Sequence, residues 1–230
     1  MGLCHEPQTS RVRGQDLPQP TTVTRPSLKT PKAAAIAGVL FSVLLFTAFW
    51  LFRISVPADP LEPGAWLQAD VGRVTLALNL VPFAGVAFLW FIGVLRDRLG
   101  EREDRFFATV FLGSGLLFLA MLFAAAAVIG ALILAFGAAP QTLIDSATFQ
   151  FGRGLAYGLV NIYTVKTAAV FMIATSTVVL HTDLAPRWVS FVGYFMALYI
   201  VFGAYFSDWN FVAFPAWIML LSVCLLWNRK

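Results

Sequence analysis

Six long apolar stretches dominate this sequence and restrict what it can fold into. They cover residues 33–52, 74–95, 106–137, 155–180, 188–206 and 211–227. Each meets the roughly 17–25 residues that a helix needs to cross the hydrocarbon core of a bilayer, and the third and fourth exceed it. The runs are continuous rather than alternating, which favours helices over barrel strands. The sequence therefore predicts an all-α, polytopic membrane helix bundle with six transmembrane helices.

Composition and segment lengths agree with this class. Hydrophobic residues make up 59% of the 230 residues and charged residues only 12%, whereas soluble domains average about 25% charged residues. The longest predicted loop, 53–73, is too short for an independent domain. We expect two regions: a disordered, basic, cytoplasmic tail at 1–32, rich in Pro, Ser and Thr, and a transmembrane domain at 33–230.

The positive charges orient the predicted helices. Twelve of the sixteen Lys and Arg residues fall in segments that share one side of a six-helix arrangement: Arg11, Arg13, Arg25, Lys29, Lys32, Arg96, Arg98, Arg102, Arg105, Arg187, Arg229 and Lys230. The loops on the opposite side hold Arg53, Arg73 and Arg153. The positive-inside rule then predicts that both termini lie in the cytoplasm.

Lys166 is the only Asp, Glu, Lys or Arg residue inside the predicted spans. It lies roughly 16 Å along the fourth helix from the end at residue 155, close to the bilayer midplane. An intramembrane lysine is by default a hypothesis for a functional site. The alternative is that its stem extends toward an interface or a partner group, such as Tyr163, and only fixes helix packing.

Two amides form a second candidate feature. Asn79 and Asn161 lie at similar depths in the second and fourth predicted helices, so a hydrogen bond between them is available if the helices touch. Pro82 removes a backbone hydrogen bond nearby, which could open a kinked, hydrated region as in transporters. Structural packing is the commoner role for such amides. The candidate polar or solute site is therefore Lys166, Asn79, Asn161, Tyr163 and Pro82.

Small residues predict close helix packing in the third and fourth helices. Gly154 and Gly158 form a GxxxG pattern, and Gly113 and Gly115 give the third helix a small surface. Such residues let helix backbones approach each other in membranes.

Residues of the catalytic and metal-binding types are sparse. The histidines are His5 and His181, and the cysteines Cys4 and Cys224 have no neighbouring ligand at metal spacing. Ser114 and His181 share the cytoplasmic half, but His181 lies at a loop edge, so a Ser–His hydrolase is not favoured. We predict a non-enzymatic protein with no catalytic residues, no metal, no cofactor and no nucleic-acid partner.

Residues 166–194, KTAAVFMIATSTVVLHTDLAPRWVSFVGY, carry a polar-interrupted helix, a short turn and then Pro186-Arg187-Trp188 opening the next helix. This segment resembles part of uncharacterised multi-pass bacterial membrane proteins of the actinobacterial type. The resemblance implies a location in the bacterial inner (plasma) membrane and transfers no activity or site residue.

Two functions remain open on the sequence. The first is an accessory or partner-binding helix bundle whose partners are the lipid bilayer and either another membrane protein or a second copy of the chain. The second is a small transporter or channel for a polar or anionic solute that uses Lys166 and the Asn79–Pro82 region. The absence of a detectable sequence repeat and of a coupling carboxylate in the spans favours the first.

Overall fold

The computed structural model describes residues 2, 31–57, 64, 66–99, 105–144, 146–182, 185–203 and 210–227. All regular secondary structure in these segments is helical, as predicted. Four apolar helices are long enough to cross a membrane: Lys32–Ser55, Val71–Arg96, Ala108–Ala138 and Ala147–Thr182. Two shorter apolar helices follow, at Arg187–Gly203 and Val212–Trp227. The predicted tail at 1–32 lies almost entirely outside the described residues.

The elements run along the chain as ten helical segments within the described residues. Their bounds are α1 (Pro31–Ser55), α2 (Trp66–Ala69), α3 (Val71–Leu99), α4 (Arg105–Ala138), α5 (Pro140–Ile144), α6 (Ala147–Gly158), the π-helical segment η2 (Leu159–Thr164), α7 (Val165–Thr182), α8 (Arg187–Gly203) and α9 (Asn210–Trp227). Prolines occupy the first position of α1 and α5, where a missing N–H costs no hydrogen bond. The long third apolar stretch forms one uninterrupted helix, α4, as its length predicted.

The fourth apolar stretch forms a longer helix than the sequence predicted. The predicted span begins at residue 155, but α6, η2 and α7 run on from Ala147 to Thr182. Ser146 caps the start, because its hydroxyl accepts a hydrogen bond from the Phe149 N–H at 3.2 Å. Arg153 was assigned to a loop and lies inside α6 instead. Its charge is accommodated there by tertiary contacts that hydropathy does not register.

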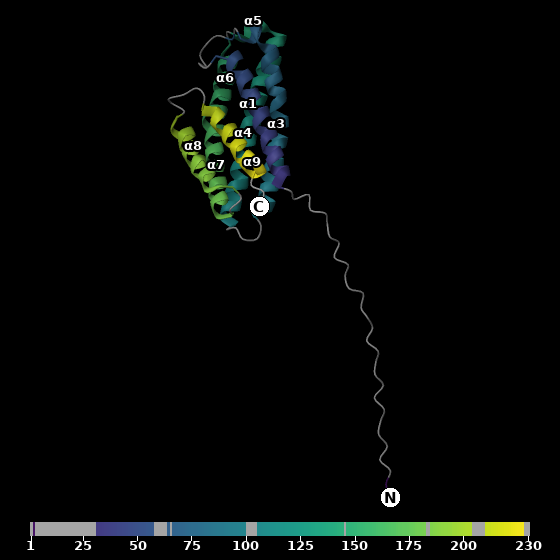
Figure 1. The fold of residues 1–230 in the computed structure, drawn as a ribbon. Helices are drawn as coiled ribbons and strands as arrows, with labels where there is room; N and C mark the ends of the chain where they lie inside the picture. Colours follow the sequence, from purple (N-terminus) through teal and green to yellow (C-terminus); the bar gives the residue numbers. More distant parts are fainter. Residues whose placement is uncertain are drawn as a thin grey trace.

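The helices pack side by side into one bundle (Figure 1). Helix α1 contacts α3 and α9, α7 contacts α8, and α4 lies against α3, η2 and α7. Helix α5 lies at one end of the bundle, beyond α8 and α9, and α9 ends at the opposite end (Figure 1).

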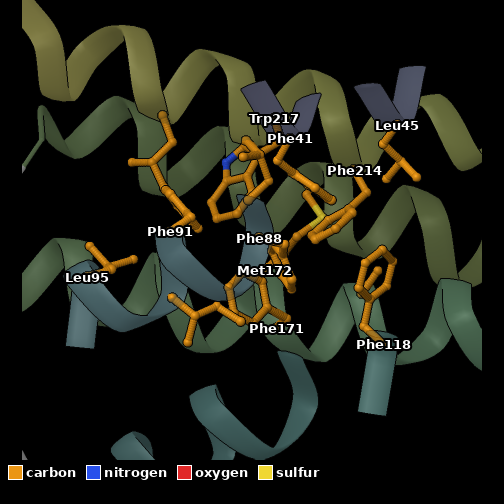
Figure 2. Close-up of a cluster of buried hydrophobic side chains, with 14 of the residues drawn as sticks. Phe41, Leu45, Phe88, Phe91, Leu95, Phe118, Phe171, Met172, Phe214 and Trp217 are labelled. Atoms are coloured by element: carbon orange, nitrogen blue, oxygen red, sulfur yellow. The ribbon is translucent and has the colours of Figure 1, made fainter. Parts of the chain in front are cut away.

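Phenylalanine rings fill the centre of the bundle (Figure 2). Phe41 of α1 and Phe88 of α3 have ring centroids 4.6 Å apart. Phe88 also lies 5.1 Å from Phe171 of α7, and Phe118 of α4 lies 4.7 Å from Phe214 of α9. Tilted and edge-to-face pairs of this kind add about 0.5–1.5 kcal/mol each beyond their burial. One aromatic cluster thus connects five helices.

Trp217 packs at the meeting point of α7, α8 and α9. Its side chain is fully buried, and its indole Nε1 donates to the Val189 carbonyl at 3.4 Å. A Cβ atom placed on Gly193 of α8 would lie 2.7 Å from this Nε1 and would overlap the Ser176 hydroxyl. A residue without a side chain is therefore required at position 193, where α8 packs against Trp217 of α9.

The glycines predicted to mediate packing differ from one another. A Cβ on Gly115 would lie 2.6 Å from Ile92 of α3 and 3.2 Å from the Phe171 ring, so this glycine permits close approach. A Cβ on Gly113, Gly154 or Gly158 would meet no atom within 4 Å. These three glycines do not set the packing within a single chain.

The outward faces of the helices are apolar. Large exposed side chains occur on every long helix, among them Trp50, Phe83, Trp90, Leu117, Phe151, Phe195 and Phe202. Monomeric soluble proteins rarely expose contiguous apolar area on this scale, and a lipid-facing surface accounts for it.

We predict that Phe88→Ala destabilises the bundle much more than Phe83→Ala on the same helix. Phe88 is fully buried among five other rings, whereas Phe83 is 67% exposed. The expected loss for Phe88→Ala is roughly 2–3 kcal/mol, below the range for water-soluble cores because lipid is itself apolar. Thermal unfolding of the detergent-solubilised protein measures it. Equal effects of the two substitutions would contradict the central role of the cluster.

Candidate functional site

A π-helical segment interrupts the longest helix at mid-length. In η2, from Leu159 to Thr164, one extra residue is accommodated per turn. The Thr164 hydroxyl donates to the Leu159 carbonyl five residues back at 2.8 Å, and the Val165 N–H reaches the Val160 carbonyl. Such π segments change which residues face the bundle, and they occur frequently at functional sites. Three residues of the predicted polar site, Asn161, Tyr163 and Lys166, lie in or next to this one.

Lys166 faces outward from the bundle. Its side chain is exposed, and in the described parts of the chain no ion pair joins it to another residue. By helical rise it lies roughly 19 Å from the level of Arg153 and 24 Å from Thr182, so it is near the middle of the bundle's length. Tyr163, one turn earlier, is 57% exposed on the same outer wall.

The two predicted amides are not joined to each other. The Asn79 amide donates to the Thr75 carbonyl at 3.0 Å, and the Asn161 amide donates to the Tyr157 carbonyl at 3.1 Å. Each amide is therefore satisfied within its own helix. Helix α4 packs against both α3, which carries Asn79, and η2, which carries Asn161. Asn79 and Pro82 are exposed on α3, and Asn161 is half-buried. The structure thus places Asn161, Tyr163 and Lys166 in or directly after η2 and leaves Asn79 and Pro82 on another helix, α3.

Thr164 is the inward-facing member of the π segment, and it lines a small cavity. The cavity has a volume of about 10 Å³ and lies among α1, α4, η2, α7, α8 and α9. Its lining residues are Phe49, Phe118, Val160, Thr164, Val165, Ala168, Ile200, Asn210 and Phe214. All but Thr164 and Asn210 are apolar, so these two provide its polar side chains.

Asn210 was not selected from the sequence, because it falls between the fifth and sixth apolar stretches. It is the first residue of α9 and only 6% exposed, and its Oδ1 accepts no hydrogen bond from the residues that the structure describes. The available signal was its position immediately before an apolar helix, where Asn is a preferred residue. That preference predicts a helix start but not burial beside η2.

A second polar residue missed by the sequence reasoning is Arg153, which is 4% exposed. Its guanidinium donates to the Pro57 carbonyl at 3.0 Å and lies 5.9 Å from the centroid of the Trp66 ring. It therefore connects α6 to the segment that follows α1 and to α2. Around it lies an apolar end cluster, defined here as Trp66, Leu67, Val74, Ile129, Leu132, Leu143, Phe149 and Ala156.

The remaining chemistry-bearing residues bond locally. The Ser114 hydroxyl donates to the Val110 carbonyl at 2.6 Å, and His181 Nδ1 lies 2.8 Å from the Thr177 carbonyl. Within the described segments, no group of three or more His, Cys, Asp or Glu side chains is arranged to hold a metal ion.

Comparison of the chain with protein-family models, with curated proteins and with solved structures gives no significant match.

We predict that Arg153→Met loosens the end of the bundle that contains α2, α5 and α6. The substitution removes a charge-assisted hydrogen bond to Pro57, which is expected to cost roughly 1.5–3 kcal/mol. Thermal unfolding and amide hydrogen exchange in α2 and α6 measure the effect.

The matched control is Arg73→Met. Arg73 forms an ion pair with Asp70 at 2.8 Å, and its side chain is 59% exposed, so the expected change is within about 0.5 kcal/mol. If Arg153→Met were no more harmful than Arg73→Met, the proposed role of Arg153 at the end cluster would be wrong.

Proposed function

We propose that this chain is a non-enzymatic helix bundle of the bacterial inner membrane, which binds another membrane protein through the outward face of η2 and α7. The partner is a transmembrane helix that carries an Asp or Glu at the depth of Lys166. The resemblance of residues 166–194 to multi-pass bacterial membrane proteins is consistent with the location.

The single observation that carries this proposal is the outward direction of Lys166. A lysine near mid-membrane costs about 2.5–3.5 kcal/mol on insertion scales, and such residues usually face a bundle interior or pair with another group. Here the side chain lies on the outer wall, flanked by exposed Tyr163, Val170 and Ile173. A carboxylate on a neighbouring helix would offset the cost, and the predicted spans of this chain contain none.

The packing of the centre favours this function over solute transport. Phenylalanine rings in mutual contact, together with other apolar side chains, occupy the space between α1, α3, α4, α7 and α9. The cavity beside η2 has a volume of about 10 Å³, close to the minimum for one water molecule. Asn79 and Pro82, the other residues of the transport hypothesis, lie on the exposed side of α3.

We further propose six membrane crossings with both termini in the cytoplasm. Helices α8 and α9 contain 17 and 18 residues, which corresponds to roughly 26–27 Å by helical rise and is slightly less than a typical hydrocarbon thickness. A bilayer accommodates such short spans by local thinning. The charge distribution along the sequence supports the orientation.

Photocrosslinking in native membranes tests the partner. With p-benzoylphenylalanine in place of Tyr163, we expect a discrete adduct with a second membrane protein, whose crosslinked peptide contains Asp or Glu within an apolar span. The same probe at Phe83, which is exposed on α3, should give no such adduct.

Substitution of the lysine provides the charge test. Lys166→Met should reduce the adduct at position 163 several-fold because it removes the ion pair, whereas Lys166→Arg should retain it. Absence of any adduct, or an adduct between two copies of this chain, would overturn the proposed carboxylate-bearing partner. The amount of protein in the membrane must be matched between variants.

Cysteine labelling tests the six crossings. In a chain with Cys4 and Cys224 replaced by serine, single cysteines are introduced at Ala139, Ser207 or Lys230. A membrane-impermeant maleimide should label the first two in intact spheroplasts and label position 230 only after permeabilisation. Labelling at position 139 with protection at position 207 would reduce the number of crossings to four, whereas protection at both positions with labelling at position 230 would show the opposite orientation.

A further inference from the structure

The buried face of α6 does not continue directly into the buried face of α7. In α6 the buried residues include Phe149 and Ala156, which lie seven positions apart and so nearly two helical turns apart. The same step, continued along an uninterrupted α-helix, leads to Tyr163 and Val170. Both of these side chains are exposed, at 57% and 44%. The helix therefore changes its rotational phase between α6 and α7, which is where η2 lies.

Contacts with α4 give the size of this change. Helix α4 is one uninterrupted α-helix and packs against both α6 and α7. A Cβ atom placed on Gly152 of α6 would lie 2.9 Å from Leu132 Cδ2 of α4. In α7 the ring of Phe171 stacks on Phe111 of α4, with ring centroids 5.0 Å apart.

The spacing of these two contacts contains one residue more than a whole number of turns. Phe171 follows Gly152 by 19 positions. At about 100° per residue, 19 residues of α-helix would leave the two side chains about 100° apart, whereas 18 residues make about five complete turns. A π turn accommodates one extra residue, so the η2 segment removes this mismatch.

We propose that η2 acts as a one-residue phase shift, which lets α6 and α7 use the same face against α4 while Lys166 stays on the outer wall. The shift also directs Arg153, whose guanidinium donates to the Pro57 carbonyl at 3.0 Å. In an unbroken α-helix held by the contacts of α7, α6 would be rotated by about 100°. Arg153 would then take the place of Gly152 opposite Leu132. The inference stands apart from the partner proposed for Lys166, because it concerns the direction of side chains and not what binds them.

Deletion of one residue from the π segment tests the phase shift. Deletion of Ile162, which is 43% exposed, leaves 18 positions between the two contacts with α4. We expect η2 to become α-helical and the thermal midpoint of the detergent-solubilised full chain to fall by only a few degrees.

The matched control is deletion of Leu117, which is 53% exposed on α4. Helix α4 is α-helical throughout Arg105–Ala138, so it has no surplus residue to lose. The deletion rotates Phe111 relative to Leu132 by about 100°, and we expect loss of the cooperative thermal transition. Equal losses in the two deletion variants would overturn the phase shift.

A disulfide between α4 and α6 reports the register directly. In the full chain with Cys4→Ser and Cys224→Ser, the pair Leu132→Cys and Gly152→Cys should form a disulfide on oxidation. The same disulfide is expected after deletion of Ile162. Its loss there, with the protein still present in the membrane, would show that α6 has rotated and that the segment holds no surplus residue.

A variant of unchanged length separates residue count from side-chain chemistry. Thr164→Val removes the hydroxyl that donates to the Leu159 carbonyl at 2.8 Å across the π turn. Because the surplus residue is still present, we expect this variant to retain the disulfide between positions 132 and 152. Loss of the disulfide would mean that the hydroxyl, and not the number of residues, imposes the π turn, and the proposal would be wrong.

Discussion

The need to satisfy backbone hydrogen bonds without water governs this structure. In hydrocarbon each unpaired N–H or C=O costs several kcal/mol, so an apolar chain must form helices. Many polar side chains in the described helices follow the same constraint and bond to a carbonyl of their own helix. Among them are Ser42, Thr47, Asn79, Ser114, Asn161, Thr167, Thr175 and Thr182. These bonds satisfy the polar groups but do not specify which helices associate.

Association is specified instead by shape. The phenylalanine cluster joins α1, α3, α4, α7 and α9 through ring contacts, and Gly115 and Gly193 allow close approach at two crossings. Lipid is as apolar as these side chains, so burial alone gives little preference for one arrangement. Interlocking rings and small residues provide the preference, because dispersion contacts depend on close fit.

A few polar contacts do leave their own helix, and they lie at distinct levels of the bundle. Arg153 reaches the Pro57 carbonyl near one end. The hydroxyls of Thr177 and Tyr194 are 2.8 Å apart between α7 and α8. Between these levels lies η2, where Thr164 and Asn210 line the same cavity. In the π segment Tyr163 is exposed, whereas Thr164 is buried and faces the interior of the bundle.

The apolar runs alone predicted the helical class and the unbroken course of α4, because hydrophobic length and backbone pairing are local properties of the chain. The same reasoning selected Lys166, Asn161 and Tyr163 as candidate site residues, together with Asn79 and Pro82. It could not predict that Lys166 faces outward, that Asn79 bonds within α3, or that Arg153 and Asn210 are buried. The direction of a side chain depends on which neighbouring helices cover it, and on whether a distant carbonyl, ring or cavity receives it. Those partners come from remote parts of the chain, so only the tertiary structure decides them.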